Sequence, residues 1–162
     1  MIKKTRRRRP HTYVIGQPLF VTFRLRGCLP KDRDIAERSI LSVDAFACYD
    51  GLLDRATSGP VYLRIPAIAE IVVKAIEPAA VDSYTLHAWS VMPNHAHLLI
   101  TPLIDPAVIL NQFKGRTARE ANLELGRQRQ PFWQHESYDR VVRGAEEFRR
   151  IENYIVWNPV RA

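Results

Sequence analysis

The centre of the sequence contains two strand-like segments that are separated by one short turn. Residues 84–92 are rich in apolar, aromatic and β-branched residues, and residues 95–101 have the same character. Pro93-Asn94, which lies between them, is typical of a turn. We therefore predict a hairpin, and because residues 84–92 are apolar on both faces, we expect that strand to lie in the middle of a sheet.

Strand and helix patterns alternate around this hairpin. An earlier strand is predicted over residues 13–25, and a later extended segment over residues 132–142. Helices are expected over residues 34–56, from Pro66 to a loop at residues 78–83, over residues 106–125, and from Gly144 to Pro159.

With the two helices before the hairpin taken as one helical segment, the order strand, helix, strand, strand, helix, strand, helix predicts the fold class. It is α+β: a ferredoxin-like split βαβ sandwich with an antiparallel central sheet and a C-terminal helix that carries Tyr154. A length of 162 residues is typical of one domain. We expect residues 1–10 to form a basic flexible arm and residues 11–162 to form that domain.

Composition limits the partners and the compartment. The net charge of +7 favours a polyanionic partner, most simply a nucleic acid, although a basic protein without such a partner remains an alternative. Cys28 and Cys48 form no CxxC pair, so we interpret them as reduced thiols. The basic N-terminus is not followed by a long apolar stretch, so we expect no secretory signal, and the sequence contains no apolar run of membrane-spanning length. We expect a cytoplasmic, nucleoid-associated protein of bacterial type.

His95 and His97 are the first candidates for chemistry. Side chains alternate along a strand, so these imidazoles should lie on one face while Ala96 and Leu98 face the core. Two neutral imidazoles on one face are good ligands for a divalent metal ion, which needs a third ligand from elsewhere. The alternative is a pair of exposed or hydrogen-bonded histidines without a metal.

The predicted C-terminal helix offers further candidates. Tyr154 and Asn158 are four residues apart and are therefore neighbours on one helical face, beside an apolar stripe that includes Ile151 and Ile155. Packing of this stripe on the sheet would bring Asn158 to the metal and Tyr154 beside it. An activated phenolate can attack a phosphodiester and conserve its energy in a phosphotyrosine. Alternatively, Tyr154 is a core or interface residue.

Three segments occur together in an order and spacing that resemble a known family. They are Met-Pro-Asn-His-Ala-His-Leu-Leu at residues 92–99, the stretch at residues 132–143, and the stretch from Tyr154 to Val160. On these segments the chain resembles the IS200/IS605-like single-tyrosine transposases of the HUH superfamily. Within them it looks most similar to the REP-associated tyrosine transposases (the RAYT group).

The resemblance implies a metal-dependent single-stranded DNA endonuclease and strand transferase that forms a 5′-phosphotyrosine at hairpin-associated sites. It implies Tyr154 as the nucleophile, and His95, His97 and Asn158 as ligands of Mg²⁺ or Mn²⁺. Tyr138 is the competing nucleophile, but position 142, four residues later, is Val142 rather than a metal ligand. The RAYT group is expected to act as monomers, whereas insertion-sequence relatives act as homodimers.

Two other functions remain open. One is a catalytically silent single-stranded DNA-binding regulator on the same fold, and the other is an HUH replication initiator or relaxase; the short chain favours a transposase over the latter. In each case DNA phosphates need cations. The candidate DNA-binding residues are Lys3, Lys4, Arg6, Arg7, Arg8, Arg9, Lys114, Arg116, Arg140 and Arg143.

Overall fold

The computed structural model describes residues 13–29, 43–56 and 58–161. Their strands form one four-stranded sheet in the order β2-β3-β1-β4, and all neighbouring strands are antiparallel. Strand order and element order together are those of a ferredoxin-like fold, as the sequence predicts. The elements are β1 (Leu19–Arg24), α2 (Val43–Asp54), η1 (Tyr62–Arg64), α3 (Pro66–Ser83), β2 (Tyr84–Val91), β3 (His95–Pro102), α4 (Pro106–Glu124), β4 (Tyr138–Val141) and α5 (Ala145–Arg161).

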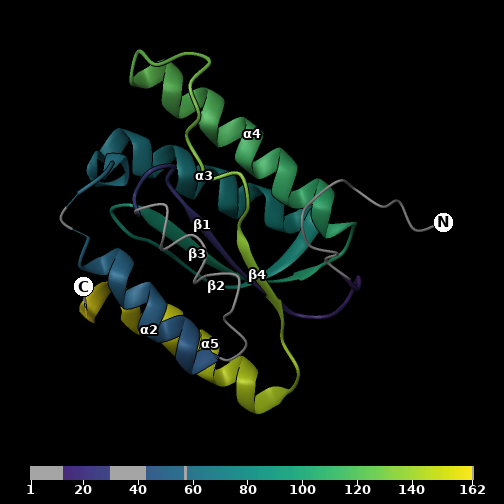
Figure 1. Cartoon of the computed structure of the whole chain (residues 1–162). Coiled ribbons are helices and arrows are strands. Elements are labelled where there is room, and N and C mark those ends of the chain that lie inside the picture. Colours follow the sequence, from purple (N-terminus) through teal and green to yellow (C-terminus); the bar gives the residue numbers. More distant parts are fainter. Residues whose placement is uncertain (1–12, 30–42, 57, 162) are drawn as a thin grey trace.

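Helices cover both faces of the sheet. In Figure 1, α3 and α4 lie on one face, and α2 and α5 lie side by side on the other. Alternate residues of β3 serve the two layers: Leu98 and Ile100 join the larger hydrophobic core with α3 and α4, whereas Leu99 joins a smaller core with Ile151 and Ile155 of α5. The predicted apolar stripe of the last helix is thereby confirmed.

Phe46 anchors α2 in the smaller core. Its ring stacks on Tyr138 with a centroid distance of 4.3 Å and meets Phe20 edge-on at 5.1 Å. Asn94, in the turn between β2 and β3, also donates its amide to the carbonyl of Leu53, at 2.8 Å. Aromatic packing and one buried hydrogen bond therefore hold α2 against the sheet.

The expected central position of the residues 84–92 strand is wrong, because β2 is an edge strand. Its apolar character has another cause: α3 packs against β2, and so does α5. Burial of an edge strand by helices produces the same two-sided pattern as a position in the middle of a sheet.

Several predicted boundaries also change. The first strand begins at Leu19 rather than at residue 13. Helix α3 continues through Pro78 to Ser83, where a loop was expected, and the buried Tyr84 that follows donates its hydroxyl to the carbonyl of Ile76. This contact ties the last turns of α3 to the start of β2.

The C-terminal helix α5 continues to Arg161, past Pro159, which was expected to end it. Cys28 is buried and forms no disulfide among the described residues, whereas the side chain of Cys48 lies outside them. Among the helices that the structure describes, none has the length and apolar character needed to cross a membrane.

Candidate active site

His95 and His97 lie on the sheet face that α2 and α5 cover. Both side chains are fully buried, with 0% exposure. Their ring centroids are 4.8 Å apart, so the prediction that they share one side of the strand is confirmed. Without a metal, the sequence allowed two arrangements of the histidine pair, exposed or hydrogen-bonded. Their burial excludes the exposed arrangement.

A carboxylate that the sequence analysis did not identify lies between the two imidazoles. Asp50 of α2 is also 0% exposed, and its Oδ2 atom is 3.0 Å from Nε2 of His97. Its other oxygen, Oδ1, is 3.4 Å from Nε2 of His95. Asp50, His95 and His97 form a buried group whose potential ligand atoms all lie within 4.8 Å of one another.

Asn94 determines which nitrogen of His95 carries a proton. The Asn94 amide nitrogen donates to the carbonyl of Leu53, and this contact orients its oxygen toward Nδ1 of His95, 2.7 Å away. Because that oxygen can only accept, Nδ1 of His95 is the protonated nitrogen. In the neutral ring, Nε2 then presents a lone pair toward Asp50.

His97 has a different kind of neighbour on its Nδ1 side. The hydroxyl of Thr22 in β1 is 2.8 Å away, directly across the β1–β3 pair. A hydroxyl both donates and accepts, so Thr22 is compatible with either neutral tautomer of His97. Complete burial lowers the pKa of His97, against the opposing attraction of Asp50, which favours the neutral imidazole that a metal ion needs.

The pKa values of two carboxyl groups of α2, Asp50 and Asp54, are shifted in opposite directions. Burial alone would raise the pKa of Asp50, but the charges of His97 and His95 and their hydrogen bonds hold it well below the ordinary value of 3.8. Asp54, one helical turn later, has its Oδ1 atom 3.8 Å from Nε2 of His95. Burial raises the pKa of Asp54, and the charge of Asp50 raises it further. Asp50 is therefore the anionic centre of the site.

Helix α5 brings Tyr154 and Asn158 to the same carboxylate. The phenol of Tyr154 donates a hydrogen bond to Oδ2 of Asp50, and the amide of Asn158 donates to the same oxygen at 3.3 Å. Asn158 is buried and Tyr154 is half-buried. The structure thus brings together all four residues, at 95, 97, 154 and 158, that the sequence analysis selected for the metal and nucleophile roles.

Tyr138, the competing nucleophile, lies in a packed environment. It is 5% exposed and its ring belongs to the smaller core, stacked on Phe46. Burial raises the pKa of its phenol, with a partly opposing effect of Arg140. A buried phenol with a raised pKa is a poor source of phenolate.

The candidate DNA-binding residues do not converge on this site. Lys114 and Arg116 lie on α4, which belongs to the opposite layer (Figure 1). Lys114 donates to the carbonyls of Gln134 and His135, at 2.6 and 2.7 Å, and Arg116 pairs with Glu120. Lys114 thus contacts the segment after α4, and Arg116 contacts an exposed residue one turn later on the same helix.

The other basic candidates lie near the start of α5 or beyond the described residues. Arg140 of β4 forms an ion pair with Glu147 at 2.6 Å, and the backbone N–H of Arg143 donates to the same carboxylate. Arg143 itself is exposed. The basic arm lies outside the described residues, with its cations Lys3, Lys4, Arg6, Arg7, Arg8 and Arg9.

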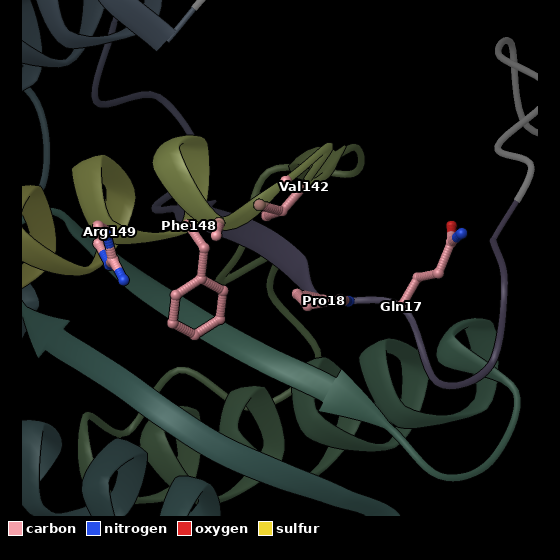
Figure 2. Close-up of a pocket in the computed structure, with 7 residues that line it drawn as sticks. Gln17, Pro18, Val142, Phe148 and Arg149 are labelled. Carbon is pink, nitrogen blue, oxygen red and sulfur yellow. The ribbon is translucent and has the colours of Figure 1, made fainter.

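A separate hollow of about 500 Å³ lies at the N-terminal end of α5. In Figure 2, Phe148 and Arg149 project from the first turns of the helix, near Pro18 and Val142. Asn158 is near the other end of the same helix, so this hollow is distinct from the site around Asp50. Its lining is largely apolar and contains no pair of titratable groups.

Sequence reasoning did not identify three residues that contact the candidate site, namely Asp50, Asn94 and Thr22. One signal for Asp50 is present in the sequence: Phe46, Asp50 and Leu53 have the spacing of one helical face. All three are buried, and a carboxylate within an apolar stripe needs a partner. Asn94 precedes His95 directly, but only the tertiary contact with Leu53 gives it a role.

Comparison with known proteins identifies the family. The fold is a ferredoxin-like sheet, and its buried histidine pair lies beside a tyrosine of the last helix. Residues 67–158 match the family model described as "Transposase IS200 like", and this match covers more than half of the chain. The chain belongs to the IS200-like transposase family and is accordingly a transposase-type DNA strand transferase.

One solved structure supports this fold, and a second shows a weaker likeness. A REP-associated tyrosine transposase bound to a REP hairpin superposes with a TM-score of 0.56 at 17% identity, covering 99% of this chain and 74% of that one. A candidate transposase from Deinococcus radiodurans R1 gives a TM-score of 0.40 at 18% identity, covering 93% of this chain and 96% of that one. A search of curated protein sequences gave no match.

Proposed function

We propose that the protein is a metal-dependent single-stranded DNA endonuclease and strand transferase of the RAYT group, with Tyr154 as its nucleophile. One observation carries this proposal. Tyr154 and Asn158 reach across from α5 to the same carboxylate that lies between His95 and His97. A nucleophile, two imidazoles and an amide at one point are suited to metal-assisted phosphodiester cleavage.

The site is suited to a divalent cation. Nε2 of His95 and Oδ1 of Asp50 are buried atoms without a hydrogen-bond partner among the described residues. Such atoms are costly in a dry interior unless a cation or proton satisfies them. His95, His97 and Asn158 would hold Mg²⁺ or Mn²⁺, because imidazole and amide oxygen are accepted ligands of these ions. When bound, the ion would polarise the scissile phosphate.

Tyr154 performs the covalent step in this proposal. Its phenolic oxygen attacks the phosphorus atom, the bond from phosphorus to the 3′ oxygen breaks, and the 5′ side becomes a phosphotyrosine. The phenol loses one proton and the departing 3′ oxygen gains one, so charge and atoms balance. The hydrogen bond to Asp50 orients the phenol oxygen before attack. Reversal by a 3′-hydroxyl rejoins strands.

The proposed substrate is single-stranded DNA that contains a hairpin. Two findings support it: the family match, and the solved REP-associated tyrosine transposase, which was captured with a REP hairpin. The net charge of +7 is appropriate for a phosphate backbone. We propose that the protein acts as a monomer, in line with the RAYT group, with a homodimer as the alternative.

A second candidate function follows from the burial of the site. Asp50 of α2 and the histidines of β3, His95 and His97, are all 0% exposed where α2 and α5 cover the sheet, so a scissile phosphate reaches them only if one of these helices shifts. If both helices stay in place when DNA binds, the protein is a catalytically silent single-stranded DNA-binding regulator. A replication initiator or relaxase has no such supporting observation.

Adduct formation distinguishes these functions. Labelled single-stranded hairpin DNA is incubated with the parent protein and Mg²⁺ or Mn²⁺, and covalent protein–DNA adducts are resolved on a denaturing gel. We expect an adduct with the parent, none with Tyr154→Phe or His97→Ala, and retained adduct with the control Tyr138→Phe. DNA binding by Tyr154→Phe should persist. An adduct that survives Tyr154→Phe and disappears with Tyr138→Phe would show that the nucleophile is misassigned.

A further inference from the structure

We propose that Asp50 of α2 is a direct carboxylate ligand of the divalent-ion site, together with His95 and His97. This inference rests on the proposed function only in assuming the same ion. The family match begins at residue 67, so Asp50 lies outside it and receives no role from it. The role comes instead from the position of α2 against the sheet.

The distances within the group have the scale of a coordination shell. Oδ2 of Asp50 is 3.0 Å from Nε2 of His97, and Oδ1 is 3.4 Å from Nε2 of His95. Two ligand atoms at about 2.1 Å from one ion, at right angles, lie about 3.0 Å apart. The carboxylate therefore needs little movement to share an ion with both imidazoles.

The facing atoms of His95 and Asp50 leave a place for a cation between them. Asn94 contacts Nδ1 of His95, so Nε2 is the nitrogen that faces the carboxylate, 3.4 Å from Oδ1. Both facing atoms, Nε2 of His95 and Oδ1 of Asp50, are fully buried and have no hydrogen-bond partner among the described residues. Polar atoms without a partner are costly in a dry interior. A metal ion coordinated by both atoms would remove that cost.

A carboxylate ligand would change the properties of the site. It neutralises one charge of the ion and adds a hard oxygen to the imidazoles, which favours Mg²⁺ or Mn²⁺ over softer metals. It also links metal binding to α2, because Asp50 is the residue through which α2 would contact the ion. Binding should therefore slow hydrogen exchange of α2 amides around residue 50.

Mn²⁺ titration of the full chain without DNA tests this role, with free Mn²⁺ followed by electron paramagnetic resonance. Asp50→Asn should weaken binding by more than about 100-fold, beyond the roughly 10–100-fold that loss of an outer-shell partner causes. Asp54→Asn is the matched control, because it removes the same charge from the same helix. We expect it to change the affinity by less than about 5-fold, because Asp54 lies near His95 but outside the cluster of potential ligand atoms.

A crystal of the parent protein grown with Mn²⁺ provides a test that does not depend on folding of a variant. The anomalous peak should lie within about 2.3 Å of an Asp50 oxygen. Three results would overturn the proposal: no Mn²⁺ binding by the parent at millimolar concentration, Asp50→Asn affinity within about 3-fold of the parent, or an ion held by His95, His97 and Asn158 alone. Failure of the adduct assay with Mn²⁺ bound through Asp50 would instead reject only the proposed function.

Discussion

The phenol of Tyr154 donates a hydrogen bond to Oδ2 of Asp50, a residue 104 positions earlier in the chain. The same oxygen lies 3.0 Å from Nε2 of His97 and accepts from the amide of Asn158 at 3.3 Å. One carboxylate oxygen thus connects α2, β3 and α5. Donors around a buried anion compensate for its lost hydration, which explains how Asp50 remains charged inside the smaller core.

Asn94 should control the affinity of the site without contacting an ion. Asn94→Ala removes the acceptor that orients His95 and the donor to Leu53. Because outer-shell partners hold ligands in the correct tautomer, we expect Mn²⁺ affinity to fall about 10–100-fold, measured by calorimetry. Gln112→Ala, on the exposed side of α4, is the control and should leave the affinity unchanged. Equal affinities of both variants would contradict this role.

Phe46 should be the main anchor of α2. Phe46→Ala deletes a ring that packs between Phe20 and Tyr138, so we expect the free energy of unfolding to fall by roughly 3–5 kcal/mol in urea titrations. Val156→Ala, at a position that is 56% exposed on α5, should change stability by less than about 0.5 kcal/mol. A similar, small loss in both variants would show that α2 adds little to the core.

Trp157 is a candidate surface for bases. It is 52% exposed, beside Asn158, whereas Trp133 is buried and donates its indole N–H to Thr117. Trp157→Ala should leave thermal stability nearly unchanged and weaken single-stranded DNA binding by about 1–3 kcal/mol, because bases stack on exposed aromatic rings. Fluorescence anisotropy measures the affinity. Unchanged binding would show that the indole of Trp157 does not stack on DNA bases.

The basic arm should contribute affinity rather than sequence preference. Deletion of residues 1–9 removes Lys3, Lys4 and four arginines, and each lost phosphate contact lowers the slope of log affinity against log salt by about 0.7. We expect weaker binding to every single-stranded sequence, with unchanged ranking among hairpins. An affinity of the parent chain that does not depend on salt would contradict the electrostatic argument.

Tyr84 should make the fold sensitive to alkali. Burial raises the pKa of its phenol from 10.0 to about 12. Because the folded-state pKa lies above the unfolded one, its contribution to stability is complete below pH 10 and is lost as the pH rises to about 12. The stability difference between the parent and Tyr84→Phe should therefore shrink across this window in urea titrations. A constant difference would indicate that Tyr84 ionises as it does in the unfolded chain.

The sequence alone predicted the parts of the site that depend on local periodicity. His95 and His97 share a face because strand residues alternate, and Tyr154 and Asn158 are neighbours because a helix repeats every three to four residues. The ferredoxin-like order of elements followed from the same patterns. Local rules were weaker at element ends: α3 passes Pro78 and α5 passes Pro159, where a proline was expected to end each helix.

Only the tertiary structure showed that Asp50 lies between His95 and His97. Asp50 joins the site because Phe46, one turn earlier on α2, stacks on Tyr138 and brings the helix against β3. The edge position of β2 depends in the same way on how helices cover the sheet. Periodicity determines which face of an element a side chain occupies, but the partner of that face depends on packing between segments that are distant in the chain.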